Sequence, residues 1–403
     1  MTTPPKFLFA ATALAVLSAC DRGNIDIDVP TAYSFERDGV STVSYSGQTD
    51  RLAMGAELGT ALKDPAATAS SLQEMFANQD AQGNDVDPFT SADLNASTKS
   101  IRSKVAASYR YFDANTSGSA AIKADFDSWI QAQANQVLPF IDSLAASGHA
   151  GQIADGTTPR YVDANGFEYD QFIIKGLNGA LILDQMLNNY LDPGVLDAGT
   201  NREDQENGVT VEGKPYAMME HKWDEAYGYL FGGAINGASP LSTVGQDDVF
   251  MNKYLGRVIG DMDFENDATE IFDAFKTGRA AIVAGDYELR DEQADLIKER
   301  MSAIVGIRAV YYMKTAGVEL AAGNYGSAFH DIGEGYGFIY ALQFSQDPAT
   351  NQPYFTAAEV EAMLTDLQDD GPNGLWDLEI NTLDQIAENI AARFDFTVAQ
   401  TID

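Results

Sequence analysis

Two stretches of the chain share one pattern: HKWDEAYGY at residues 221–229 and HDIGEGYGF at residues 330–338. In both, a histidine is followed by glutamate four positions later, tyrosine six later, glycine seven later and an aromatic residue eight later. We call them the first and the second histidine frame. The two histidines lie 109 residues apart (330 − 221), which is far longer than a solenoid repeat. The pattern therefore predicts a duplicated half-domain, with the same side chains on two related pieces of structure.

The sequence around both frames has the periodicity of α-helices. Apolar residues recur every three or four positions from residue 52 onward, in long segments rich in alanine. No segment has the continuous apolar run of a buried parallel strand. We therefore expect an all-α fold, a duplicated two-half helical bundle with about four helices in each half. The expected helices are 52–63, 72–78, 92–115 with a break, 120–146, 169–190, 216–232, 267–284, 290–316, 325–343, 356–367 and 375–394.

A small β-hairpin is expected ahead of the helices. Residues 33–45 alternate apolar and polar side chains on both sides of the pair Asp38-Gly39. Aspartate and glycine tolerate the positive φ angles that a two-residue turn requires. The predicted order is thus a hairpin, a first helical half at 51–245 and a second helical half at 246–403.

The first twenty residues are typical of an export signal. Lys6 precedes an apolar, alanine-rich stretch at 7–17, which is too short to span a bilayer and has the length of a signal-peptide core. The stretch ends in LSAC at 17–20, which resembles the bacterial lipobox, and Cys20 is the only cysteine of the chain. We expect a signal peptide at 1–19, lipidation of Cys20, and a lipid anchor, tether and hairpin at 20–50. The protein would be held to a membrane of the cell envelope by this lipid, facing the periplasm or the cell surface.

The charge of the chain excludes one class of partner. It has 60 acidic and 25 basic residues, a net charge of −35. Such a charge repels the phosphates of nucleic acids, so we expect no nucleic-acid partner. The content of hydrophobic residues, 45%, indicates a folded core. The acidic segments 78–87 and 261–267 lack the spacing of a calcium-binding loop and are expected to be solvated surface.

The two frames contain the candidate site residues. Positions i and i+4 of a helix share a face, so His221 and Glu225, and likewise His330 and Glu334, point the same way. Asp224 adds a carboxylate in the first frame only. Facing helices of a bundle can bring such groups around one cation, which predicts a metal or ligand site with a divalent metal such as iron or zinc. Two other interpretations stay open: a histidine–glutamate pair that serves packing alone, and a hydrolytic centre.

Two family resemblances follow from these motifs. The segments YSFERDG at 33–39 and STVSYSGQT at 41–49, together with the first frame, resemble an uncharacterised bacterial lipoprotein family, domain of unknown function 4856, whose name carries no activity. More distantly, the helical halves and the histidine–carboxylate helix resemble the imelysin-like superfamily, which comprises envelope proteins associated with iron uptake and once proposed to be metallopeptidases. Imelysins carry Gly-x-His-x-x-Glu. This chain has Met219 and Asp224 at the glycine and glutamate positions of the first frame, and Ala328 and Gly333 in the second.

These observations predict a lipid-anchored envelope protein that binds a metal or another ligand and is not an enzyme. The imelysin resemblance implies a link to iron acquisition, with a protein of an envelope uptake system as partner. One alternative is an imelysin-type metallopeptidase, in which His221 and Glu225 bind the metal. The other is a structural lipoprotein that binds a partner protein.

Overall fold

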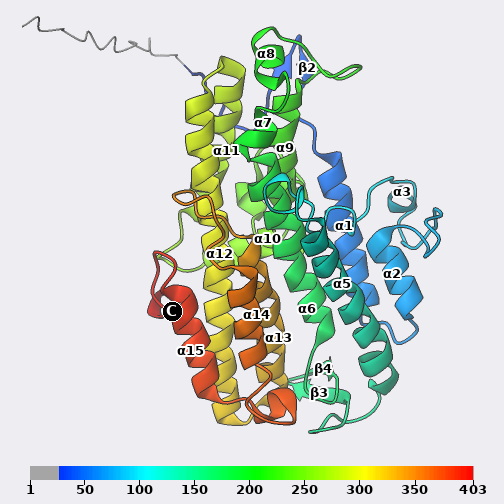
Figure 1. Ribbon diagram of the computed structural model, residues 1–403. Coiled ribbons are helices and arrows are strands. Elements are labelled where there is room, and N and C mark those ends of the chain that lie inside the picture. The colour runs from blue at the N-terminus through cyan, green and yellow to red at the C-terminus, as the bar shows by residue number, and fades with distance from the viewer. Residues whose placement is uncertain (1–26, 403) are drawn as a thin grey trace, which may run out of the picture.

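The computed structural model describes residues 27–402, which are mostly helical with two small antiparallel sheets. Figure 1 shows the long helices side by side, with one hairpin at each end of the molecule. Within the described residues, no helix is long and apolar enough to cross a membrane. The predicted signal peptide and the lipidation of Cys20 lie outside the described residues.

The longest helix, α12 (Tyr287–Ala322), runs along the length of the molecule on the side away from α1 and α2 (Figure 1). It ends at Gly323, whose φ of 75° lies in the left-handed region that favours glycine. The chain then turns back as α13 (Tyr325–Ala341), which packs along α12. Helices α11 (Asp267–Ala284) and α15 (Ile380–Ala391) pack against α12 as well. The helices predicted in these segments are therefore confirmed.

The predicted helix 169–190 is present but is not regular throughout. It begins as α6 (Tyr169–Leu177) and continues through two π-helical segments, η3 (Asn178–Leu183) and η4 (Met186–Tyr190). Both α6 and η3 pack against α13. A π turn contains an extra residue and so shifts the following side chains to another face. Polar side chains are buried along the whole segment, and that of Asp184, between the two π-helical segments, is completely enclosed.

The first histidine frame lies on α9 (Met218–Phe231), which packs against α1 (Ser46–Ala61), η4 and α11. Glycine at the eighth position of each frame marks a close contact between elements. A Cβ on Gly228 would lie 2.4 Å from the Cβ of Tyr45, and a Cβ on Gly337 would lie 2.3 Å from the Cβ of Lys175. Both frames therefore need this glycine for packing.

The N-terminal hairpin is confirmed, although its strands are short. Strands β1 (Glu36–Arg37) and β2 (Val40–Ser41) flank Asp38 and Gly39, whose φ angles are 53° and 75°. A second hairpin, β3 (Gly151–Asp155) with β4 (Thr158–Val162), was not expected from the sequence.

The helix predicted at 92–115 is wrong over most of its length. Only α3 (Ala92–Asn95) and α4 (Tyr109–Phe112) are helical there. Between them Ala106 has a φ of 45°, and the backbone N–H groups of Ala107 and Ser108 donate to the carboxylate of Asp184 instead of to a helical carbonyl. A tertiary contact has thus replaced the local hydrogen bonds of a helix.

Several other elements differ from the prediction or complete it. The helix expected at 120–146 ends early, as α5 (Thr116–Ala132) followed by a π turn and a 3₁₀ turn that reach Phe140. The short helix α10 (Met251–Val258) was not predicted. One buried core extends from Tyr33 to Phe396, and the boundary between halves at residue 245 stays a prediction. The remaining helices are α2 (Ala69–Ala77), α7 (Pro193–Leu196), α8 (Asn201–Glu206) and α14 (Ala357–Asp366).

Candidate functional site

The first histidine frame is closed by a buried polar network around Asp224. The carboxylate of Asp224 is fully buried and accepts hydrogen bonds from the Tyr33 hydroxyl (2.7 Å), the Ser44 backbone N–H (3.1 Å) and Arg279 Nε (3.2 Å). Arg279, also fully buried, pairs in addition with Glu220 at 3.2 Å. Burial raises the pKa of Asp224 to about 6, against the opposing effect of Arg279. This network joins the N-terminal segment to α9 and α11.

His221 and Glu225 of the same frame have separate protein partners. His221 Nδ1 lies 3.0 Å from the Ser44 carbonyl oxygen and therefore donates to it, and the ring stacks on Tyr216. Glu225 accepts hydrogen bonds from Gln48 (3.1 Å) and from Lys222 (2.8 Å). Burial lowers the pKa of His221, so the neutral imidazole is favoured. The first frame thus has the contacts of a structural element.

The second frame, on α13, forms a chain of alternating charges. His330 Nδ1 lies 2.7 Å from Glu168 Oε2, and His330 Nε2 lies 3.9 Å from Glu334 Oε1. Glu334 pairs in turn with Lys175 at 3.0 Å. Burial alone would lower the pKa of His330, but the hydrogen bond and charge of Glu168 and the charge of Glu334 outweigh it and raise the pKa. The charged imidazolium is therefore favoured here, in contrast to His221.

Glu334 is held in its ionised form. Its burial by itself would raise the pKa, but the positive charges of Lys175 and His330 and a hydrogen bond from Tyr312 outweigh burial and hold the pKa far below its usual range. Tyr254 also places its hydroxyl 3.4 Å from Glu334. The carboxylate is thus surrounded by donors at neutral pH.

The two frames do not form one site. The first frame contacts residues 44–48 and α11, whereas the second contacts α6 and α10, so no partner is shared. Within residues 27–402, no group of three or more His, Cys, Asp or Glu side chains could hold a metal ion. Zinc sites use three or four such protein ligands. The side chains of the two frames therefore do not fit the iron or zinc ion expected from the sequence.

A pocket opens next to the second frame. It has a volume of about 490 Å³, lies between α10, α12 and α13, and is lined by His330 and Glu334 among others. Three basic side chains, Lys253, Arg257 and Arg308, also line it. None of the three forms an ion pair within the part of the chain that the structure describes. The second frame is thus part of a pocket wall with unpaired positive charge.

Sequence reasoning missed these three basic residues. Arg308 is the one charged residue in the otherwise apolar run IVGIRAV at 304–310, which was the available signal. Lys253 and Arg257 lie on α10, a helix of eight residues whose apolar residues Met251, Tyr254, Leu255 and Val258 have helical spacing, a signal that the prediction did not use. Only the packing of α10 against α12 brings the three together.

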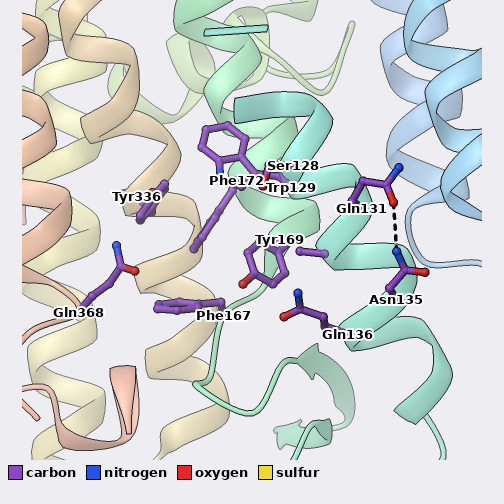
Figure 2. A pocket seen from close by; sticks show the side chains of 11 residues that line it. Ser128, Trp129, Gln131, Asn135, Gln136, Phe167, Tyr169, Phe172, Tyr336 and Gln368 are labelled. Carbon is purple, nitrogen blue, oxygen red and sulfur yellow. Dashed lines mark hydrogen bonds between the residues drawn. The ribbon is translucent and has the colours of Figure 1, made fainter. Parts of the chain in front are cut away.

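A second, uncharged pocket of about 360 Å³ lies beside the same helix α13. Figure 2 shows its aromatic wall, in which Tyr336 of the second frame stacks on Phe172 with ring centroids 3.8 Å apart. Amide side chains lie opposite, among them Gln131 and Asn135, which are joined by a hydrogen bond of 3.1 Å (Figure 2). Tyr336 therefore packs on a face of α13 other than that of His330.

The fold and these sites define a predominantly helical protein with one closed polar network and one polar pocket on the two related sequence frames. The chain belongs to the family described as domain of unknown function DUF4856, whose model matches residues 30–397. This range includes the N-terminal hairpin and both frames. No curated protein and no solved structure matches the chain. The family membership predicted from the sequence is confirmed, and its description carries no activity.

Proposed function

We propose that this protein is a lipid-anchored component of the bacterial cell envelope that binds a small ligand without catalysing a reaction. The observation that carries the proposal is the pocket beside His330 and Glu334. Its volume of about 490 Å³ falls in the range of ligand sites, about 300–1,000 Å³. The anchor is the lipid on Cys20, which follows the signal-like segment 7–17.

The charges of His330 and Glu334 favour ligand binding over proton transfer by these two groups. A general acid or base works best when its pKa lies near the working pH. The pKa of Glu334 is far below that range, and the carboxylates of Glu168 and Glu334 raise the pKa of His330, which favours its cation. Neither group is therefore suited to accept a proton from a substrate near neutral pH.

We further propose that the two frames come from an imelysin-like duplication and that the protein is linked to iron acquisition. In support, each frame helix packs against the long helix that precedes it: α9 against η4, and α13 against α12. Gly228 and Gly337 occupy the same position of the two frames, and each makes a close contact with another segment, Gly228 with Tyr45 and Gly337 with Lys175. Under this proposal the halves have diverged, because α13 packs along α6 whereas α9 packs against α1.

Ligand binding is tested with the full-length lipoprotein, extracted from membranes in detergent. A library of small molecules is screened by thermal unfolding of the wild type and of Gly260→Phe. Gly260 lines the pocket, and the nearest atom to a Cβ placed there is the Arg257 carbonyl oxygen at 3.2 Å, so the larger side chain would fill the pocket. We expect at least one compound to raise the melting temperature of the wild type and to leave that of Gly260→Phe unchanged. Failure of every compound, or an equal response of the variant, would contradict a ligand site here.

The anchor is tested separately through Cys20. A Cys20→Ser variant should no longer incorporate a labelled fatty acid and should leave the membrane fraction, because a thiol is the attachment point of the lipid. Unchanged labelling or unchanged membrane association would rule out the proposed anchor.

A further inference from the structure

The pocket beside the second frame gathers positive charge in a strongly acidic protein. The whole chain has 25 basic against 60 acidic residues, yet Lys253, Arg257 and Arg308 meet around one pocket. We infer that this pocket binds a small organic anion, a carboxylate or a phosphate, and that these three side chains hold it. The inference names the ligand class of the proposed function and rests on that function.

Arg308 is an exception among the buried arginines of residues 27–402. Arg279 and Arg290 are both completely buried, and both pair with carboxylates. Arg51 donates to two backbone carbonyl oxygens, those of Gly47 and Ser100. Arg308 is only 7% exposed, forms no ion pair, and its Nε has no acceptor.

A buried guanidinium without an anion costs free energy, because it has lost its hydration and gained no hydrogen bonds in return. The rings of Tyr311 and Tyr312, whose centroids lie 4.1 and 4.4 Å from the Arg308 guanidinium carbon, offset part of this cost. They supply no acceptor for its N–H groups. A carboxylate or phosphate in the pocket would supply those acceptors, and both match the planar fork of a guanidinium.

Lys253 and Arg257 reinforce this charge from α10. They lie one helical turn apart and line the same pocket as Arg308. Burial lowers the pKa of Lys253, and the positive charges of Lys175, Arg257 and Arg308 lower it further, more than Glu334 compensates. The cations of the pocket thus repel one another, and a bound anion would relieve this repulsion.

Three carboxyl groups also line the pocket, and none of them neutralises the three basic side chains by an ion pair. Glu334 is paired with Lys175. Asp261 accepts a hydrogen bond from the backbone N–H of Asp263 at 2.9 Å. Burial raises the pKa of Asp331 to about 6, so this group is partly protonated near neutral pH.

The same charges bear on the proposed link with iron. A bare Fe²⁺ or Zn²⁺ ion would be repelled by Lys253, Arg257 and Arg308, whereas a chelate of iron with an excess of carboxylates is an anion. The volume of about 490 Å³ leaves room for an organic molecule beside the charged groups. Any iron bound here would therefore enter as an anionic complex.

The test measures binding of citrate, iron(III) citrate and pyrophosphate to the full-length protein in detergent by isothermal titration calorimetry. Glucose serves as the neutral compound and free Zn²⁺ as the cation. We expect at least one anion to bind, more weakly as salt increases, and glucose and Zn²⁺ not to bind in the pocket. Preference for citrate and iron(III) citrate over pyrophosphate would identify a carboxylate ligand, and the reverse order a phosphate.

The variant Arg308→Gln should weaken anion binding by about tenfold or more, because it removes the charge that faces the ligand. Arg257→Gln should weaken it as well, and this variant keeps the fold because Arg257 is exposed. The matched control is Arg393→Gln, which removes an exposed arginine that pairs with Glu359 and does not line the pocket. It should bind like the wild type.

Equal anion affinities in the wild type and both pocket variants would overturn the inference, as would the failure of all three anions to bind. The proposed function has a separate outcome. If a neutral or cationic library compound stabilises the wild type but not Gly260→Phe, the pocket binds a ligand and only the anion class is wrong.

Discussion

The two histidine frames have the same sequence pattern and opposite environments. In the first, His221 is neutral and donates to a backbone carbonyl; in the second, His330 lies between two carboxylates and favours the charged form. The buried polar network around Asp224 encloses the first frame, whereas the second frame lines a pocket. A shared pattern therefore specifies a helix face and does not specify what that face contacts.

The residue three positions after each histidine accounts for much of the difference. Asp224 occupies this position in the first frame, and its carboxylate forms an ion pair with Arg279 of α11. Gly333 fills it in the second, where a Cβ would lie 3.2 Å from that of Gln171 and 3.3 Å from that of Glu168. The missing side chain lets α6 come close to α13, and this approach brings Glu168 to His330.

The largest loss of unfolding free energy is expected when the buried polar network around Asp224 is broken. Asp224→Ala leaves Arg279 buried with one of its two carboxylates gone, and the Tyr33 hydroxyl loses its acceptor. Breaking a buried ion pair on one side costs about 3–5 kcal/mol of unfolding free energy. Urea denaturation measures the change, with Asp127→Ala as control, since Asp127 pairs with Arg102 at the surface. A loss below about 1 kcal/mol would show that the network does not stabilise the fold.

Gly333→Asp makes the second frame resemble the first. The new side chain would crowd Gln171 and Glu168 and would place a carboxylate near Glu168 and Glu334 without a matching arginine. We expect a loss of about 2–3 kcal/mol in unfolding free energy, and a smaller loss of about 1 kcal/mol for Gly333→Ala, which adds the crowding alone. If Gly333→Asp were as stable as the wild type, the glycine would not be what separates the two frames.

The two histidines should change stability with pH in opposite directions. His330 has a raised pKa in the folded protein, so its contribution is complete below the unfolded value near 6.5 and is lost as pH rises through the folded pKa. His221 has a lowered pKa, so its folded form loses stability as pH falls below the unfolded value.

Unfolding by urea at pH 5.5 and pH 8.5 measures this contrast. Relative to the wild type, His330→Gln should be less stable at pH 5.5 than at pH 8.5, and His221→Gln should show the reverse. Parallel changes in the two variants would mean that the frames have the same electrostatic environment.

The smallest effect concerns the pocket itself. Anion affinity should fall a few-fold as pH rises from 5 to 7.5, because Asp331, with its pKa of about 6, gains a negative charge. Asp331→Asn should flatten the profile measured by calorimetry. Asp261→Asn is the control and should leave the shape of the pH profile of anion affinity unchanged. The other charged groups that line the pocket are His330, Lys253, Arg257, Arg308 and Glu334, and Lys175 pairs with Glu334.

Much of the fold could be predicted because its signals are local. The helix at 267–284 was predicted with its correct ends, since apolar residues recur with helical period and Gly285 follows in the left-handed conformation, with a φ of 77°. Asp38-Gly39 predicted the hairpin turn because both residues tolerate positive φ angles, and both adopt them. The helix at 92–115 failed because Asp184, more than seventy positions away, binds the backbone that would have formed it.

The sequence by itself determined the helical class of this protein, the hairpin turn and the presence of two histidine–glutamate faces, because these depend on residues within a few positions of one another. Only the tertiary structure decided which face is closed and which lines a pocket. The partners that decide it are remote: Tyr33 lies 191 positions from Asp224, and Glu168 lies 162 positions from His330. Helical periodicity sets the direction of a side chain, whereas the packing of distant helices sets what it meets and which charge it carries.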